Sequence, residues 1–262
     1  MKPREETIRV GGIAVHTWVG GQGEPLLVLH GAGGNRGFTR SLTKIAERFT
    51  VWAPSHPGFG LSGDAEWMDG IDDLARFHLW FIDAASLRRP HLLGHSIGGW
   101  TAAEMAVMSP GAIDKLILVA PTGLKPAKGE ILDLFYYSPQ QRMGMTVHDP
   151  KTIPEWDALF GQPPTPAALE IATRNLEMTA RLTWKPYMHR PGLAHFLPRV
   201  TNQTLIVWGR EDRVVPVECG EQYRTLLPNA RLSVLEKCGH LPPVEQPDAF
   251  ADLVTEFLEG KP

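Results

Sequence analysis

The chain has 262 residues, of which 43% are hydrophobic and 21% are charged, so it can form the core of one large domain or two small ones. Its net charge of −3 gives no electrostatic basis for binding nucleic acid or an anionic membrane, and no stretch approaches the ~18 apolar residues of a membrane span. Cys219 and Cys238 are the only cysteines, which argues against a disulfide framework and a cysteine-based metal site. The opening "MKPREETIRVGG" lacks the apolar core of a signal peptide, so we expect a cytoplasmic chain.

Short apolar runs alternate with helix-like stretches over most of the chain. The first stretch, "TIRVGGIAVHTWVG", predicts a hairpin that turns at Gly11 and Gly12 and forms an antiparallel edge. The further predicted strands, several of them continuous Leu, Ile and Val runs, are residues 25–30, 50–54, 91–95, 115–121, 204–209 and 231–236. The helices predicted between them are residues 38–48, 70–87, 97–109, 217–227 and 247–259. This alternation predicts an α/β fold, with a mostly parallel sheet covered by helices on both faces.

The alternation stops between residues 123 and 200, where prolines are frequent and helical patterns occur near 129–142, 153–160 and 166–184. We interpret residues 123–200 as a helical cap inserted into a core formed by residues 1–122 and 201–262.

The strand predicted at residues 91–95 is followed by Gly94-His95-Ser96-Ile97-Gly98, which matches G-x-S-x-G between a strand and a helix. Such a turn is so tight that side chains at the glycine positions would clash with neighbouring backbone. Ser96 would then stand at a helix N-terminus, where developing negative charge is favoured. The motif favours a serine nucleophile over a simple glycine-rich turn.

A serine hydroxyl needs a base that is oriented by a third group. His240 follows the last predicted strand in "CGHLPP" and is the preferred base, although a loop histidine that caps the next helix has the same pattern. Glu211 and Asp212 both follow the strand at 204–209, and we favour Asp212 because it lies in the turn "GREDRVVP".

The turn "HGAGGNRGF" after the strand at 25–30 can aim a backbone N–H at the reacting atom. The N–H groups of Ala32 and Ile97 together would bind the oxyanion of a tetrahedral intermediate. His30 in this turn is more typical of a structural histidine than of a second base. No phosphate-binding motif of the G-x-x-x-x-G-K or G-x-G-x-x-G type is present.

Taken together, "HGAGG", "PSHPGFGLS", "GHSIGG", "WGREDRVVP" and "CGHLPPVEQP" resemble the α/β-hydrolase family over essentially the whole chain. The resemblance implies an eight-stranded sheet, the 123–200 segment as a cap, a triad of Ser96, Asp212 and His240, and no metal or organic cofactor. Because position 96 is Ser, the resemblance disfavours the dehalogenase and epoxide hydrolase branches, which use a carboxylate nucleophile.

The preferred function is hydrolysis of small, mostly apolar carboxylic esters through an acyl-enzyme. The alternatives are a lactonase, a meta-cleavage C–C bond hydrolase and a cofactor-free haloperoxidase-like enzyme. The C–C hydrolases typically carry Asn before the nucleophile and Trp after the catalytic histidine, where this chain has His95 and Leu241. A non-catalytic ligand-binding protein of the same fold is a further alternative, and acyl transfer to an acceptor other than water stays open.

The expected partner is a small ester or lactone substrate, with no nucleic acid or membrane, in a monomer or homodimer. Apolar side chains of the cap, with one beside His240, are candidates for the substrate pocket: Phe135, Tyr136, Met143, Met145, Trp184 and Leu241.

Overall fold

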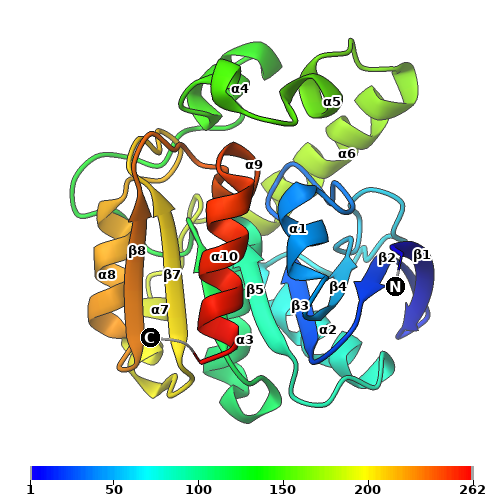
Figure 1. The fold of residues 1–262 in the computed structure, drawn as a ribbon, viewed down its shortest axis with the longest axis vertical. Helices are drawn as coiled ribbons and strands as arrows, with labels where there is room; N and C mark the ends of the chain where they lie inside the picture. The colour runs from blue at the N-terminus through cyan, green and yellow to red at the C-terminus, as the bar shows by residue number, and fades with distance from the viewer. Residues whose placement is uncertain (1, 261–262) are drawn as a thin grey trace.

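The computed structural model describes residues 2–260, and its centre is an eight-stranded sheet with the order β1-β2-β4-β3-β5-β6-β7-β8 (Figure 1). The hairpin of β1 (Arg4–Val10) and β2 (Ile13–Gly21) turns at Gly11 and Gly12, and β2 continues antiparallel to β4. The other neighbours pair in parallel and comprise β3 (Pro25–Leu29), β4 (Thr50–Pro54), β5 (His91–His95), β6 (Leu116–Val119), β7 (Thr204–Gly209) and β8 (Ala230–Leu235). The predicted α/β fold with a mostly parallel sheet is therefore confirmed.

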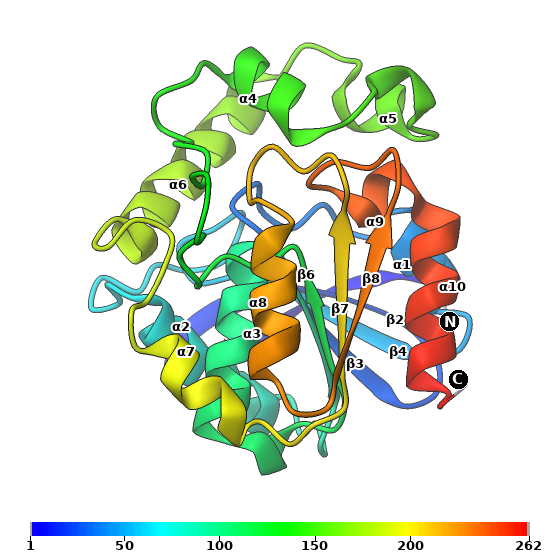
Figure 2. The ribbon, with the colours of Figure 1, turned by 90° about the vertical axis from the view of Figure 1, so that its left-hand side faces the viewer.

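Helices cover both faces of this sheet (Figures 1 and 2). On one face lie α1 (Arg40–Ile45) and α10 (Pro247–Leu258), packed on each other and on a cluster that includes Leu26, Val51 and Phe250. On the other face lie α2 (Ile71–Ala84), α3 (Ile97–Met108) and α8 (Glu218–Leu226), with the larger part of the core. Helix α3 is buried almost all round, because β5, β6 and α2 enclose it.

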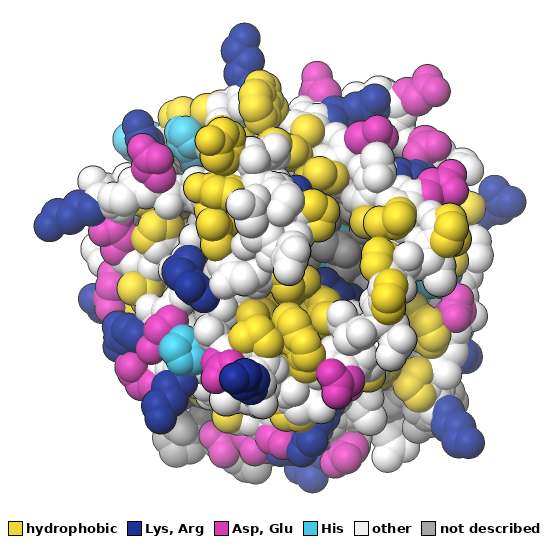
Figure 3. Space-filling view, turned by 90° about the horizontal axis from the view of Figure 1, so that it is seen from above, with side chains coloured by type: hydrophobic (Ala, Val, Ile, Leu, Met, Phe, Trp, Pro, Cys, Tyr) yellow, Lys and Arg dark blue, Asp and Glu magenta, His cyan; other side chains and the backbone are white. Residues whose placement is uncertain are grey.

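A third layer lies above the carboxyl ends of the parallel strands and consists of α4 (Pro139–Thr146), α5 (Trp156–Phe160) and α6 (Pro166–Thr183) (Figure 2). Viewed from above, hydrophobic side chains gather over the middle of this face and charged ones around its rim (Figure 3). This layer comes from the predicted cap segment. However, α7 (Leu193–Phe196) and the 3₁₀ turn Leu197–Arg199 lie low beside α3, with Leu193, Leu197 and Val200 in the main core.

One predicted helix starts later than its pattern indicates. Residues 129–138 are not helical, and α4 begins only at Pro139. Ser138 caps it, since its hydroxyl accepts from Gln141 N (3.3 Å) while Gln141 Oε1 accepts from Ser138 N (3.0 Å). The apolar residues Ile131, Leu132 and Leu134 pack against the core from irregular backbone.

Among residues 2–260, no helix has the length and apolar character that crossing a bilayer requires.

Candidate active site

Ser96 lies on the sharp turn between β5 and α3, with φ 55° and ψ −118°. This left-handed region is unfavourable for a side chain-bearing residue, so surrounding contacts must hold it. The Ser96 N–H donates to Val119 O (2.9 Å), and its carbonyl accepts from Trp100 N (3.0 Å) and Thr122 N (3.2 Å). The turn is therefore fixed to β6 and to the first turn of α3.

The glycines beside Ser96 are required by close backbone contacts. A Cβ at Gly94 would overlap the carbonyl oxygen of Gly98, and a Cβ at Gly98 would overlap the carbonyl oxygens of Leu29 and His30. The G-x-S-x-G spacing thus reflects how closely α3 approaches β3 and β5 at this point.

The structure brings Ser96, His240 and Asp212 together from the ends of three strands. His240 Nε2 lies 3.0 Å from Ser96 Oγ, and His240 Nδ1 lies 2.8 Å from Asp212 Oδ2. Because a carboxylate can only accept, Nδ1 carries the proton and Nε2 is free to accept from the serine hydroxyl. The Asp212 carboxylate is fully buried and the His240 ring nearly so, which strengthens both interactions.

Asp212 and Glu211 have different partners, which separates the two candidates for the acid. Asp212 Oδ1 accepts from the backbone N–H groups of Val214 (2.8 Å) and Val215 (2.9 Å), leaving Oδ2 for His240. Glu211 instead accepts from Cys238 N (2.9 Å) and so braces the loop that carries His240. Asp212 is the acid in contact with the histidine.

Glu245, which the sequence did not single out, also supports the histidine loop. Its buried carboxylate accepts from Gly239 N (2.9 Å), Leu241 N (3.0 Å) and His148 N (2.7 Å). It therefore binds both flanks of His240 and the chain just after α4. The sequence shows only an acid five residues after the Gly-His turn. An acid at such a spacing is too common to predict that it supports the histidine loop.

The expected oxyanion donors flank Ser96 and the turn after β3. Within residues 2–260, the backbone N–H groups of Ala32 and Ile97 have no hydrogen-bond partner, and Ala32 lines the cavity at Ser96. The turn itself is closed by a bond from Gly34 N to Gly31 O (3.0 Å). Two free donors in this position are what an oxyanion would need.

Three histidines support this turn, of which His56 and His78 are buried and His30 is half-buried. His30 accepts from His56 N at Nε2 (2.9 Å) and donates from Nδ1 to Gly31 O (2.7 Å). His56 donates from Nε2 to His30 O (2.9 Å) and accepts at Nδ1 from His78 Nε2 (2.7 Å). Burial lowers the pKa of His30 to about 4 and that of His78 to about 3, and it holds the pKa of His56 well below 6.5. All three are neutral, and His30 is structural.

His95 contacts the histidine loop from below. Its Nε2 donates to the carbonyl oxygen of His240 (2.8 Å), and burial lowers its pKa to about 3. His95 is therefore neutral and positions His240 through the backbone.

A cavity of about 290 Å³ opens above Ser96 between the core and the cap. Its walls are mostly apolar, and its lining from the cap segment is Leu134, Pro139, Arg142, Met143, Thr146, Ala172, Asn175 and Leu176. Of the pocket residues expected from the sequence, Met143 and Leu241 line this cavity.

The other four expected pocket residues lie elsewhere. Tyr136 is 79% exposed, Trp184 is 58% exposed, and Phe135 packs edge-on against Trp184 and Tyr187. Met145 is half-buried and does not line the cavity. Because residues 129–138 are irregular, the aromatic side chains at 135 and 136 do not point down a helix face toward Ser96.

Helix α6 fastens the cap to the core loops around the site. Asn175 Oδ1 accepts from Gly60 N (2.9 Å), and its Nδ2 reaches Gly33 O (3.4 Å) on the oxyanion turn. Arg174 donates to Gly60 O (2.6 Å) and Ser62 O (2.7 Å) and pairs with Asp64 (2.6 Å). Neither residue was predicted, since an Arg-Asn pair in a helix carries no local signal of this contact.

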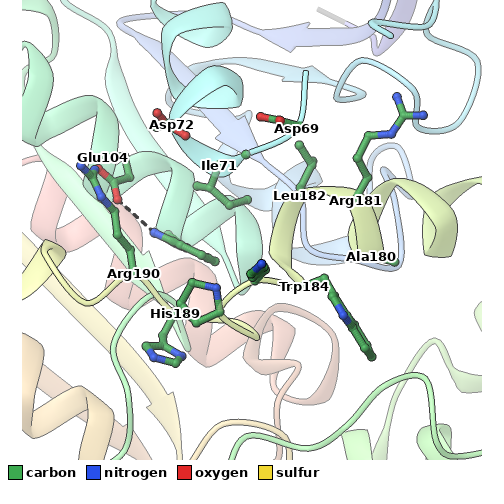
Figure 4. Close-up of a pocket in the computed structure, with 14 residues that line it drawn as sticks. Asp69, Ile71, Asp72, Glu104, Ala180, Arg181, Leu182, Trp184, His189 and Arg190 are labelled. Atoms are coloured by element: carbon green, nitrogen blue, oxygen red, sulfur yellow. Dashed lines mark hydrogen bonds and ion pairs between the residues drawn. The ribbon is translucent and has the colours of Figure 1, made fainter. Parts of the chain in front are cut away.

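A second, larger cavity of about 610 Å³ lies behind the site, between the start of α2, α3 and residues 180–190 (Figure 4). Its buried acid, Glu104, accepts from Trp100 Nε1 (3.1 Å) and pairs with Arg190 (2.6 Å). Ser96, His240 and Asp212 do not line this cavity, so we assign it no part in the chemistry at Ser96.

The comparisons with known proteins agree with the fold. The family model described as alpha/beta hydrolase fold matches residues 24–247. A 2-hydroxy-6-oxo-6-phenylhexa-2,4-dienoate hydrolase of Burkholderia cepacia is 30% identical, over 93% of this chain and 91% of its own. A 2-hydroxy-6-oxononadienedioate/2-hydroxy-6-oxononatrienedioate hydrolase of a Pseudomonas species is 29% identical, over 94% of this chain and 92% of its own. Among solved structures, a bacterial membrane phospholipase A is 29% identical with a TM-score of 0.79, covering 98% of this chain and 86% of that one.

Proposed function

Because this chain belongs to the α/β-hydrolase fold family, we propose that it is a hydrolase in which Ser96 attacks a carbonyl carbon and forms an acyl-enzyme. The observation that carries the proposal is the hydrogen-bonded array of Ser96, His240 and Asp212 beneath a mostly apolar cavity. No other group of described residues combines a hydroxyl, a base and an orienting acid in this way with free donors beside the hydroxyl.

The steps follow from the positions of the protons. His240 Nε2 takes the proton of Ser96 Oγ as this oxygen bonds to the carbonyl carbon, and Asp212 stabilises the charged imidazole. The N–H groups of Ala32 and Ile97 bind the oxyanion. When the carbonyl re-forms, the bond to the leaving group breaks, and the leaving atom takes the proton from His240. Water then repeats the sequence on the acyl-enzyme, which frees the acid and returns the proton to Ser96.

For the substrate, we propose first a C–C bond next to a ketone in a 2-hydroxy-6-oxodienoate-type compound. The two curated relatives carry the names of hydrolases of such compounds, and this supports the alternative stated from the sequence over ester cleavage. In this case the dienol first ketonises to the vinylogous 1,5-diketone, as its enol O–H proton moves to C5. The leaving atom is then C5, whose electron pair delocalises through the double bond onto the C2 carbonyl when the C5–C6 bond breaks, and the resulting enolate oxygen takes the proton from His240.

Ester hydrolysis is the second candidate. It is favoured by His95 and Leu241, which stand where C–C hydrolases typically carry Asn and Trp, and by the similarity to a phospholipase A. The steps at Ser96 are the same, but the leaving atom is an alcohol oxygen.

The test is a paired assay of wild type and Ser96→Ala on 2-hydroxy-6-oxo-6-phenylhexa-2,4-dienoate and p-nitrophenyl butyrate. We expect wild type to consume the dienoate with the higher kcat/KM, and the alanine variant to lose about 10³-fold or more on any substrate that is turned over. Turnover of the ester alone would transfer the proposal to the second candidate. Equal rates for wild type and Ser96→Ala would refute the role of Ser96.

A further inference from the structure

The cavity above Ser96 contains two arginines and no acid. Arg36 and Arg142 both line it, whereas none of its other lining residues is Asp or Glu. A guanidinium keeps its charge at any physiological pH, so the wall of the cavity carries two positive charges that no lining carboxylate balances.

Arg36 lacks a partner of its own. It follows the oxyanion turn, and its Nη2 would lie 3.4 Å from a Cβ placed on Gly33. Its guanidinium stacks on the Phe160 ring of α5, 4.6 Å from the ring centroid. Within residues 2–260, no hydrogen bond and no ion pair involves its guanidinium, and desolvation by the surrounding protein lowers its pKa. Arg36 is an exposed residue, and its side chain lines the cavity.

Arg142 is fixed but also lacks an acid. Its Nη1 donates to the carbonyl oxygens of Leu134 (2.8 Å) and Tyr137 (3.1 Å), which anchors the guanidinium at the cavity wall. Arg174 and Arg190, which join residues 123–200 to the core, pair with Asp64 and Glu104, whereas Arg213 donates only to the carbonyl oxygens of Gly144 and Val147. What distinguishes Arg36 and Arg142 is that both lack a carboxylate partner among the described residues and both line the cavity at Ser96.

We infer that Arg36, supported by Arg142, binds an anionic group of the substrate, a carboxylate on the part of the molecule remote from the scissile carbonyl. This inference rests on the proposed function, because only the proposed function makes the bound molecule a substrate. The turn after β3, which carries Arg36 close to the proposed oxyanion donor Ala32, would then determine substrate specificity. The same contact would serve an ester substrate and a ketone substrate.

The test uses two esters of equal chain length, mono-p-nitrophenyl adipate and p-nitrophenyl hexanoate, which differ by a terminal carboxylate in place of a methyl group. For wild type we expect the adipate ester to have the higher kcat/KM. In Arg36→Met the ratio of the two kcat/KM values should fall on the order of 30-fold, since a charge-assisted contact is lost. Arg36→Lys should retain part of the preference. Arg181→Met, which removes an exposed arginine of α6 outside this cavity, should leave the ratio unchanged.

A binding measurement separates this inference from the proposed function. Wild type should bind adipic acid monoamide at least 10-fold more tightly than hexanamide, which carries a methyl group in place of the terminal carboxylate, in an NMR titration, and Arg36→Met should lose this difference. Turnover of both esters with no preference for the anion, or a ratio that Arg36→Met does not change, would overturn the inference while leaving Ser96 chemistry intact. Carboxylate binding without turnover of any substrate would instead contradict the proposed function alone.

Discussion

Each side chain of the Ser96, His240 and Asp212 array is held by groups to which we assign no reactive role. Backbone N–H groups orient Asp212, Asp212 orients His240, and Glu211 and Glu245 fix the loop around His240. The sequence could predict Ser96 and His240, because each stands in a short turn after a strand. It could not separate Asp212 from Glu211 on firm grounds, because adjacent residues share every local signal and only the direction of the side chain differs.

The buried histidines predict how stability depends on pH. Their folded-state pKa values, about 4 for His30 and about 3 for His78 and His95, lie below 6.5, so only the unfolded chain takes up protons as the pH drops below 6.5. The free energy of unfolding should therefore be highest above pH 6.5 and fall toward pH 4, by up to about 1.4 kcal/mol per pH unit for each histidine. Urea unfolding at a series of pH values measures this slope.

Replacing one member of the cluster isolates its share. His78→Gln should make the slope between pH 6.5 and pH 4 shallower by about one proton, whatever its effect on stability at pH 8. His195→Gln, at an exposed histidine, is the control and should leave the slope as in wild type. An unchanged slope in His78→Gln would show that His78 is not held neutral.

At the scale of elements, the turn between β5 and α3 determines where Ser96, the proposed nucleophile, lies. Gly98→Ala should lower the free energy of unfolding by about 3 kcal/mol or more, or prevent accumulation of folded protein, because the new methyl group meets backbone oxygens that cannot move independently. Gly111→Ala is the matched control, since a Cβ there meets nothing within 4 Å and should change stability by less than about 1 kcal/mol. Chemical denaturation of both variants makes the comparison. Equal stability of Gly98→Ala and wild type would contradict the close approach of α3 to β3.

Elements with a strong period were predictable, and those set by contacts across the chain were not. Strands β4, β5 and β7 have the predicted bounds, because buried parallel strands are continuous apolar runs. The helix predicted from residue 129 instead begins at Pro139, since the Ser138 cap fixes its start and the preceding apolar residues pack from irregular backbone. Periodicity alone cannot distinguish apolar residues that form a helix face from apolar residues that pack against the core from irregular backbone.

At the scale of the whole molecule, the order of strands explains why the candidate site could be predicted while its specificity could not. Parallel strands bring their carboxyl ends to one edge, so turns after β3, β5, β7 and β8 meet although they are far apart in sequence. The cap segment has no alternation of strands and helices that would fix where its side chains lie. Its contributions, Arg142 and Asn175 among them, depend on how α4 and α6 sit above that edge, and the aromatic residues expected there face outward or pack elsewhere.

The central claim is that Ser96 is the nucleophile, and covalent labelling tests it most directly. Wild type treated with an alkyl fluorophosphonate should gain one adduct per chain, on the peptide that contains Ser96, as hydrolytic activity is lost. Ser96→Ala should gain none. Both would be followed by intact-protein and peptide mass spectrometry. An adduct on another residue that abolishes activity, or no adduct on wild type that is active, would contradict the account.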